Sequence, residues 1–496
     1  MSAARLGTKA ALGPLVQAPA YDPEQRGEGI VHLGFGAFHR AHQAVYTDDA
    51  LAAAPADWRI VGVSLRSADI AREINAQDAR YTVIERDASG SRARIIGAVS
   101  RVIAADPAAT LAALCAPQIR IVTITVTEKG YGIDLASHAP DRADPAVAAD
   151  LATPEAPRGV LGLLVEASRL RREAGHLPLT ILSCDNLPAN GVVLRDGVIG
   201  FARAARGDAL AEWIAQTIAF PCSMVDRITP APSAETASEA LRLTGCEDRA
   251  AIETEPFVQW VIEDSFPTGR PQWDAGGALF VKDVAGYERM KLTMLNGSHS
   301  MLAYAGHLTG CTYVRDVMQT PALAALVRRH MAAAAALLDP LPGAPFDAYA
   351  EALAQRFANP SIAHQTFQIA TDGTQKLPQR IFEPALLAIA QGRPLRPFAF
   401  AAAMWMRFCL GRQDDGTLYE LRDPRAAQIK AALPEQPDAA SLSAALHGLP
   451  GLIPETLGKN PDWRAAIEEI LTVALEQGSL ACVEQEAASA NTYSHV

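Results

Sequence analysis

The chain has 496 residues, of which 49% are hydrophobic and 20% charged, and its formal net charge at pH 7 is -11. Because a single hydrophobic core stops growing at roughly 250 to 300 residues, this length predicts two domains. The negative charge argues against nucleic-acid or anionic-membrane partners, since both require a positive surface. A small anionic substrate would then need a local cationic pocket.

The seven cysteines are scattered and form no C-x-x-C pair. This pattern predicts neither a disulfide framework nor a structural zinc site, and it favours a reducing compartment. The N-terminal segment carries prolines where a signal peptide needs an unbroken apolar run, and no stretch reaches the roughly 18 apolar residues of a membrane span. We therefore expect a cytoplasmic protein. No heptad pattern or exposed apolar strand demands a partner, so a monomer or weak oligomer is expected.

The first half of the chain alternates between strand and helix patterns. The predicted strands cover 30–33, 58–65, 119–126 and 179–183, and the clearest helices cover 37–54 and 160–173. The later strands are nearly continuous and β-branched, as in a parallel sheet buried on both faces. We predict an α/β fold with a Rossmann-like, doubly wound, dinucleotide-binding domain over 1–284.

From about residue 285 the chain becomes rich in alanine and leucine, with few β-branched runs. Alanine clusters at 332–336 and 399–403 lie inside amphipathic patterns, which predicts close-packed helix interfaces rather than low-complexity sequence. We expect a mostly α-helical, substrate-binding and catalytic domain over 285–496. An active site would then lie in the cleft between the two domains.

Gly34-Phe35-Gly36 lies between the first predicted strand and helix. One glycine allows a tight turn, and the next lets a pyrophosphate approach backbone N–H groups at the helix N-terminus. The third glycine of the usual fingerprint falls on His39, so the helix is not expected to pack as closely on the strand. By itself this motif is a weak signal.

Asp69 is the nearest acidic residue after the second strand and could bind the adenosine ribose hydroxyls of NAD, although an ordinary helix cap explains it equally well. Arg66 could instead accommodate the 2′-phosphate of NADP, so NAD is favoured with NADP as the alternative. His39-x-x-His42 could suggest metal ligands, but no cysteine or carboxylate accompanies it at a telling spacing. Packing near the cofactor is the simpler interpretation, and no metal is expected.

Lys291, Asn296 and His299 are candidates for alcohol oxidation by hydride transfer, which needs a base for the hydroxyl proton and donors for the forming alkoxide. On a helix over 288–304 they fall within an arc of roughly 140° at about 100° per residue. Apolar neighbours imply burial, which would lower the pKa of a lysine. A single lysine is more often a surface residue paired with a carboxylate such as Glu288. Buried Asn and His side chains are harder to explain without a function, because each needs hydrogen-bond partners.

Tyr287-x-x-x-Lys291 also matches the tyrosine–lysine pair of short-chain dehydrogenases. Those enzymes are typically single domains of about half this length with a differently spaced glycine turn. We interpret the match as accidental.

Several motifs, in order, resemble the polyol-specific long-chain dehydrogenases of the mannitol dehydrogenase family, which includes mannitol 2-dehydrogenases and fructuronate reductases. They are IVHLGFGAFHRAHQAVYTD, TVTEKGYGID, SCDNLPANG, FPCSMVDRITP, EPFVQWVIEDSFPTGRPQW, MKLTMLNGSHSMLAY and DGTQKLPQR. They span about residues 28 to 415, and such ordered agreement is highly specific.

The resemblance implies a role for individual residues. It makes Lys291 the general base and places Asn296 with Asn186 around the reacting oxygen, while His299 orients the substrate or the base. Glu288 resembles a carboxylate that gates a proton path to the lysine. The implied substrate-binding residues are Asp226 and Lys376, and the residues expected at the cofactor are Gly34, Gly36, Phe38, Arg66, Asp69 and Glu128, with Lys129 and Gly130 in the same loop.

Departures from the pattern bear on the substrate. One branch of mannitol dehydrogenases carries an arginine where this chain has Gln368, and the flanking His364 and Arg380 look more like fructuronate reductases. Either cation could pair with a hexuronate carboxylate, although Arg380 could equally brace a helix. The segment 64–67 looks more like mannitol dehydrogenases.

The sequence thus predicts an NAD-dependent, metal-independent enzyme that interconverts a keto sugar and a secondary alcohol, with D-fructuronate and D-mannonate as the preferred pair. Mannitol–fructose interconversion is the alternative. In a non-catalytic dinucleotide-binding regulator we would expect one or more of the candidate catalytic residues to be missing. Lys291, Asn296 and His299 are all present.

Overall fold

The computed structural model describes residues 4–8, 10, 12–13, 16–65 and 67–490. The chain divides into two compact units, Met1–Ala285 and Gly286–Val496. Buried apolar side chains are found in both units. No helix among the described residues combines the length and the apolar character that a membrane crossing needs.

The centre of the first unit is a five-stranded parallel sheet with strand order β6-β3-β2-β7-β8. Its strands are β2 (Glu28–Leu33), β3 (Arg59–Ser64), β6 (Val99–Ala104), β7 (Ile121–Ile124) and β8 (Thr180–Ser183). The order reverses between β2 and β7, so the carboxyl ends of these two strands form the switch point at which such sheets bind ligands. The predicted α/β class is confirmed.

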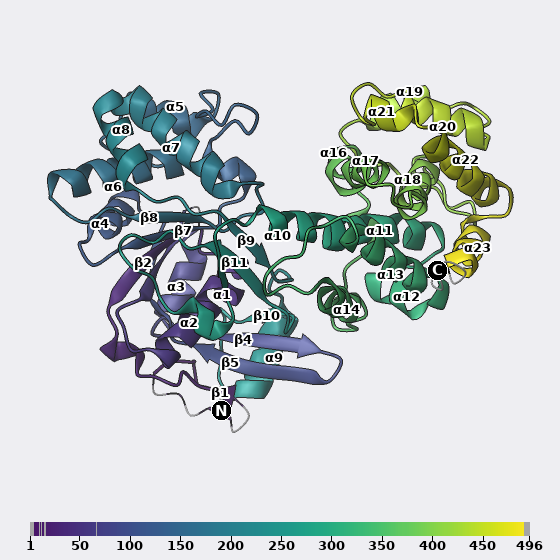
Figure 1. Cartoon of the computed structure of the whole chain (residues 1–496). Coiled ribbons are helices and arrows are strands. Elements are labelled where there is room, and N and C mark those ends of the chain that lie inside the picture. The colour runs from purple at the N-terminus through teal and green to yellow at the C-terminus, as the bar shows by residue number, and fades with distance from the viewer. Residues whose placement is uncertain (1–3, 9, 11, 14–15, 66, 491–496) are drawn as a thin grey trace. The chain divides into compact units, whose positions relative to one another are not determined.

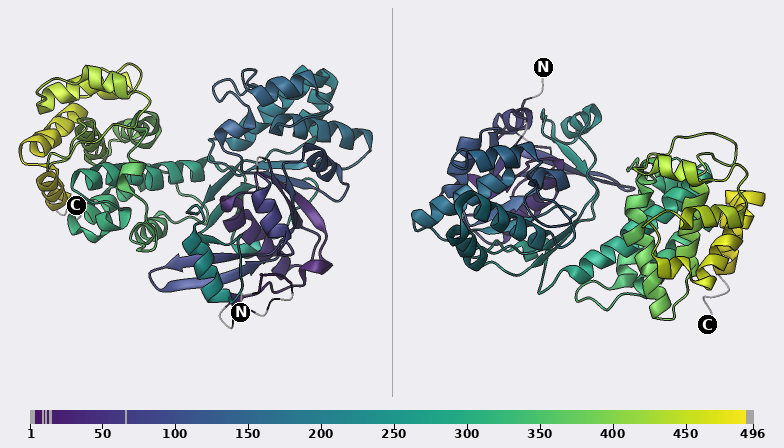
Figure 2. Two further views of the ribbon diagram at one scale, coloured as in Figure 1. Left: turned by 180° about the vertical axis from the view of Figure 1, so that it is seen from behind. Right: turned by 90° about the horizontal axis from the view of Figure 1, so that it is seen from above.

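Apolar side chains cover both faces of this sheet, because alternate residues of each strand point to opposite sides. Val31 and Leu33 of β2 belong to one core with α4 (Pro107–Cys115), α6 (Val160–Glu173), α7 (Asn190–Arg206) and α8 (Asp208–Thr217). Ile30 belongs to a second core with α1 (Ala37–Ala41), α2 (Gln43–Ala53) and α3 (Asp69–Asn75). Figure 1 shows the two helix layers on opposite sides of the sheet, and the rear view in Figure 2 agrees.

Two smaller sheets, which the sequence patterns did not predict, complete the first unit. One has the order β1-β5-β4-β10 and the other β12-β11-β9. Their strands are β1 (Val16–Gln17), β4 (Tyr81–Asp87), β5 (Gly90–Ile96), β9 (Ser223–Asp226), β10 (Ile252–Thr254), β11 (Gln259–Glu263) and β12 (Leu279–Val281). Long-range pairings such as β4 with β10 leave little trace in a local pattern.

The second unit is helical in its described part. Its longer helices are α11 (Ser298–Leu308), α13 (Pro321–Ala335), α14 (Phe346–Phe357), α18 (Arg396–Phe408), α20 (Ala439–His447), α22 (Pro461–Glu476) and α23 (Ser479–Ala490). The shorter ones are α12 (Val314–Gln319), α15 (Thr366–Ile369), α16 (Gly373–Leu377), α17 (Glu383–Ala390), α19 (Ala426–Ala432) and α21 (Glu455–Gly458). Helix α18 is buried from Pro397 to Phe408, so its alanine cluster packs between neighbouring helices as predicted.

Two predicted helices differ from the observed elements. The helix expected over 37–54 is interrupted at His42, whose φ and ψ of -120° and -89° are not helical, and α2 begins at Gln43. The helix expected over 288–304 is not uniform. It consists of α10 (Ala285–Met290), a π-helical segment η4 (Lys291–Gly297) and α11. Such wide turns occur mostly at functional sites.

Candidate functional site

Gly34 forms the turn that leaves β2, and no other residue fits there. Its φ is +94°, and a Cβ atom would lie 2.1 Å from the carbonyl oxygen of Thr125 in the loop after β7. The amides of Gly34 and Phe35 both donate to the carbonyl of Val63, at 3.0 and 2.9 Å. The turn is therefore pressed between the ends of β3 and β7. By contrast, a Cβ on Gly36 would meet nothing closer than 3.7 Å, so the space above its backbone is open.

His39 occupies the position of the third fingerprint glycine and packs directly on the strand. Its imidazole stacks on His32 of β2 with ring centroids 3.4 Å apart. Burial lowers the pKa of His32 to about 3 and lowers the pKa of His39 well below its usual value, so both rings are neutral at physiological pH. Gly62 of β3 allows another close contact on this sheet, because a Cβ atom there would lie 2.4 Å from the ring of Phe35.

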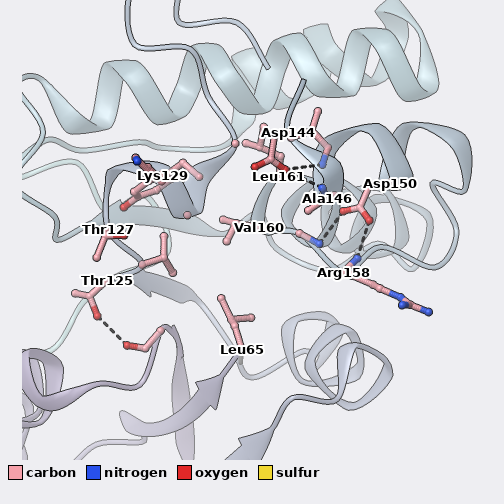
Figure 3. A pocket seen from close by; sticks show the side chains of 18 of the residues that line it. Leu65, Thr125, Thr127, Lys129, Asp144, Ala146, Asp150, Arg158, Val160 and Leu161 are labelled. Atoms are coloured by element: carbon pink, nitrogen blue, oxygen red, sulfur yellow. Dashed lines mark hydrogen bonds between the residues drawn. The ribbon is translucent and has the colours of Figure 1, made fainter. Parts of the chain in front are cut away.

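A pocket of about 410 Å³ opens at the switch point in the first unit (Figure 3). It is lined by 34–36, 64–65, 125–127 and 129–132, by residues at the start of α5 (Pro145–Ala152) and α6, and by Phe201. A pocket at the carboxyl ends of the first and fourth strands of such a sheet, beside an open glycine turn, fits a dinucleotide. Gly34, Gly36, Lys129 and Gly130, which the sequence places near the cofactor, are among the residues that line this pocket.

Sequence reasoning missed the far wall of this pocket. Asp150 accepts hydrogen bonds from the amides of Arg158 and Gly159, at 2.9 and 2.8 Å, and so orders the start of α6 (Figure 3). Asp144 caps α5 through the amides of Ala146 and Val147. The Asp144-Pro145 pair is a helix-start signal that could have placed α5, although not its position in the pocket.

Three residues predicted at the cofactor do not line the pocket. Asp69 is the first residue of α3, 80% exposed, and forms an ion pair with Arg72 at 3.4 Å; the N-cap position is Ala68. Phe38 stacks on His42 with ring centroids 5.0 Å apart. Glu128 begins the short helix η2 (Glu128–Tyr131) and is exposed. Arg66 lies outside the described residues.

The loop after β7 is held in an unusual shape. Thr127 has φ 68° and ψ 162°, a region that only glycine adopts without strain, at a typical cost of about 1–3 kcal/mol. Its neighbours Thr125 and Val126 line the pocket. Strained residues are found mostly where the surrounding structure fixes a functional geometry.

The SCDNLPANG motif builds the turn that carries Asn186. The buried side chain of Asn190 donates to the carbonyls of Ser183, Asp185 and Ser223 and accepts from the Ser223 amide. These four bonds join the turn after β8 to the start of β9, whose last residue is the buried Asp226. Only glycine fits at position 191, where a Cβ atom would lie 2.5 Å from the Phe220 carbonyl oxygen.

The His39-x-x-His42 pair has no common ligand position. His39 faces His32, whereas Nε2 of His42 bonds to the Gln259 carbonyl oxygen at 2.9 Å. Among the described residues, no three His, Cys, Asp or Glu side chains are grouped so as to hold a metal ion.

In the second unit, Lys291 and Asn296 stand at one face of η4. In a π-helix the backbone bonds run from i to i+5, so residues five apart lie one turn above another. Asn296 and His299 are then three apart at the entry to α11. Lys291, Asn296 and His299 are partly exposed, whereas Thr293–Leu295 are buried. The wide turns place the three side chains on one face more closely than a uniform α-helix would.

A second π-helical segment, η5 (Pro378–Phe382), packs against the first. Gly297 makes the approach possible, because a Cβ there would lie 3.0 Å from the Arg380 carbonyl oxygen. Nη1 of Arg380 donates long hydrogen bonds to the Asn296 carbonyl, at 3.4 Å, and to Ser300 Oγ, at 3.3 Å.

Basic side chains lie close together around His299 of α11. They include Arg356 of α14 and Arg380 of η5. The ring of His299 lies 4.4 Å from that of Phe357 and 5.5 Å from that of His364. Burial lowers the pKa of His299 well below its usual value, and the nearby His364, Arg356 and Arg380 lower it further. The His299 ring is therefore a neutral hydrogen-bonding group, not a cation.

Lys376 lies beside them. Its Nζ donates to the carbonyls of Thr371 and Ile369, at 2.7 and 3.3 Å, and Asp372 lies 3.9 Å away. Burial lowers the pKa of Lys376, and the positive charge of Arg380 lowers it further. Burial also lowers the pKa of His364, with a contribution from Lys376. The positive charges of Arg356, Arg380 and Lys376 therefore outnumber the neighbouring negative charge of Asp372.

Comparisons with known proteins agree with this architecture. The family model of the mannitol dehydrogenase Rossmann domain matches residues 28–275, and that of the mannitol dehydrogenase C-terminal domain matches residues 283–455. These matches define an oxidoreductase with a Rossmann domain followed by a helical domain. The chain belongs to the mannitol dehydrogenase family, which confirms the resemblance that its motifs indicated.

Individual relatives match over nearly the whole chain. "Uncharacterized oxidoreductase YeiQ" of Escherichia coli K12 is 44% identical, covering 92% of this chain and 93% of that protein. D-mannonate oxidoreductase of the same strain is 42% identical, with 94% and 97% covered. The solved ternary complex of Pseudomonas fluorescens mannitol 2-dehydrogenase with NAD and D-mannitol is 35% identical, with a TM-score of 0.80 over 98% of this chain and 99% of that one.

Proposed function

We propose that this chain is an NAD(H)-dependent reductase that interconverts D-fructuronate and D-mannonate. The observation that carries the proposal is the guanidinium of Arg380. It is partly buried, which lowers its pKa, and in the described part of the chain no carboxylate lies within ion-pair distance of it. A substrate carboxylate would neutralise this charge and relieve its repulsion with Lys376, whereas a neutral keto sugar would not.

The proposed reaction needs one hydride and one proton. The nicotinamide, when bound, supplies or accepts the hydride. Lys291 takes the hydroxyl proton of the secondary alcohol in one direction and returns it to the carbonyl oxygen in the other. The side-chain amides of Asn296 and Asn186 donate hydrogen bonds to that oxygen as charge develops on it.

Other residues orient the sugar. His299 is neutral, so it can accept or donate one hydrogen bond without repelling a protonated Lys291. Asp226 and Lys376 bind hydroxyl groups away from the reacting carbon, and Glu288, one helical turn before Lys291, passes protons between the lysine and solvent. Arg380 and His364 bind the carboxylate.

NAD is the proposed cofactor, and a member of the family has been solved with it. The residues of the first unit fit the dinucleotide because the backbone above Gly36 is open. Asp69 is exposed at the start of α3, the helix that follows β3, where its carboxylate can accept bonds from ribose hydroxyls and repel a 2′-phosphate. The proposal places the enzyme in the cytoplasm, acting as a monomer or weak oligomer, and all seven cysteines are free.

Mannitol 2-dehydrogenase is the second candidate function, because one relative whose structure has been solved carries that name. Oxidation of NADH with fructuronate, tagaturonate, fructose and xylulose separates the two. We expect the highest kcat/KM with fructuronate. A preference of more than tenfold for fructose would overturn the uronate assignment, and no turnover with any of them would favour a dinucleotide-binding regulator.

The role of Arg380 is tested on the same panel. Arg380→Leu should lower kcat/KM for fructuronate by roughly 10- to 100-fold, because one charge-assisted contact is lost, and leave the low rate with fructose within threefold. Arg380→Lys keeps the charge but loses the planar guanidinium group. Its kcat/KM for fructuronate should lie between those of the wild type and Arg380→Leu. If kcat/KM fell equally for fructuronate and fructose and the melting temperature also fell, the role of Arg380 would be to stabilise η4 and not to bind a carboxylate.

A further inference from the structure

The carboxylate of Asp185 joins two loops at the carboxyl end of the central sheet. It accepts hydrogen bonds from the amide of Val126 at 2.9 Å, from the amide of Thr127 at 3.2 Å and from the hydroxyl of Tyr131 at 2.8 Å. All three donors belong to the loop after β7, whereas Asp185 belongs to the turn after β8. Asp185 therefore fixes one turn against the other.

Each of the joined loops carries part of the proposed chemistry. Val126, Thr127 and Tyr131 line the pocket that fits the dinucleotide. Asp185 immediately precedes Asn186, and its own carbonyl is held by the buried Asn190. The Tyr131 hydroxyl also bonds to Ser183 Oγ at 2.6 Å, which ties the loop to the last residue of β8.

The loop needs such a restraint because of Thr127. Its left-handed backbone is unfavourable for a β-branched residue, and without external bonds the peptide would relax to an ordinary conformation. Both carboxylate oxygens of Asp185 are used, one on each of two successive amides. An asparagine could accept only with its one oxygen and would turn an NH₂ group toward a donor.

We propose that Asp185 is a positioning residue, which holds Thr127 in its left-handed conformation and so shapes the pocket wall for the dinucleotide. This inference rests on the proposed binding of NADH and not on the identity of the sugar. Asp185 touches no reacting atom. It acts through the loop after β7, so its first effect is on cofactor affinity.

The test is the dissociation constant for NADH, measured on the full chain by quenching of protein fluorescence. Asp185→Asn should raise it about tenfold. Tyr131→Phe removes the hydroxyl's bonds to Asp185 and to Ser183 but keeps both amides bound to Asp185, and it should raise this constant about threefold. It provides the measurement if the aspartate variant does not fold.

A glycine at position 127 tests the mechanism. Glycine adopts the Thr127 conformation without strain, so Asp185→Asn in a Thr127→Gly background should raise the dissociation constant threefold or less over Thr127→Gly alone. A merely structural aspartate would give the same factor in both backgrounds.

Asp248→Asn is the matched control. Asp248 is also a buried carboxylate in the first unit, bonded to the amides of Thr82 and Ala250 and to Gln77, but it does not line the pocket. It should lower the melting temperature and leave NADH affinity within twofold. Three results would overturn the inference. The dissociation constant for NADH could stay within twofold of the wild type in Asp185→Asn, or it could rise as much in Asp248→Asn as in Asp185→Asn. The factor caused by Asp185→Asn could also be the same with and without Thr127→Gly. Wild-type protein that does not bind NADH would instead overturn the proposed function.

Discussion

The hydroxyl of Tyr287 donates a hydrogen bond of 2.7 Å to the carbonyl of Pro342, and its ring is buried. The hydroxyl of this tyrosine is therefore engaged in packing within the helical unit. The geometry supports the interpretation of the Tyr287-x-x-x-Lys291 match as accidental.

Tyr287→Phe should consequently leave kcat/KM within twofold. Its free energy of unfolding should fall by about 0.5–1.5 kcal/mol, the usual loss for one hydrogen bond. Steady-state kinetics and urea unfolding measure the two effects. If turnover instead dropped by two orders of magnitude at unchanged stability, the tyrosine would have a chemical role.

Lys291→Ala should lower kcat by roughly 10²- to 10⁴-fold, the usual contribution of a general base. The affinity for NADH should stay within twofold, because every residue lining the pocket proposed to bind it belongs to the first unit and Lys291 to the second. Turnover and fluorescence titration of NADH check the two halves. Lys430→Ala, at an exposed position of α19, is the control and should match the wild type. Near-normal turnover in Lys291→Ala would remove the lysine as the base.

The two glycines of the turn should respond differently to alanine. Gly34→Ala places a Cβ atom 2.1 Å from the Thr125 carbonyl oxygen in a backbone with positive φ, so we expect a large loss of stability, more than about 2 kcal/mol. Gly36→Ala meets no atom closer than 3.7 Å and should fold with nearly unchanged stability, yet bind NADH at least tenfold more weakly, because the methyl group enters the pocket. Thermal unfolding and NADH titration of both variants check this, and unchanged NADH affinity in Gly36→Ala would argue against a pyrophosphate above that backbone.

His330 should contribute to instability in acid. Burial lowers its pKa to about 4, against about 6.5 in the unfolded chain. As pH falls below 6.5 the unfolded state binds the proton first, so the stability present above pH 6.5 is lost toward pH 4, by up to about 1.4 kcal/mol per pH unit.

His330→Leu removes this titration and loses one long hydrogen bond, between Nδ1 and the Pro397 carbonyl at 3.4 Å, because Nε2 has no hydrogen-bond partner. The variant should lose less stability than the wild type between pH 6.5 and 4, as measured by urea unfolding. Met331→Leu, the neighbouring buried position in α13, should keep the pH dependence of the wild type. An equally steep acid loss in His330→Leu would assign the effect to other buried histidines such as His32 and His39.

Local patterns were sufficient for much of the fold. The helix predicted over 160–173 is observed as Val160–Glu173, and the strand predicted over 30–33 lies within Glu28–Leu33. These elements have strong periodicity or a continuous apolar run, and each buries its apolar face as the pattern requires. The break at His42 and the wide turns of η4 were not predictable, because both depend on how neighbouring elements pack.

The site shows the same division. The sequence alone singled out Lys291, Asn296 and His299 as residue types that suit alcohol oxidation, and its ordered motifs determined the family. It could not show that Asp185 bonds to the loop after β7, since Val126 is 59 residues away. Only the tertiary structure decided which residues wall the pocket, how η4 turns Lys291 and Asn296 to one face, and that Arg380 lacks a carboxylate partner among the described residues. The physical reason is that residue type and periodicity act locally, whereas burial, charge balance and backbone strain arise only when distant segments meet.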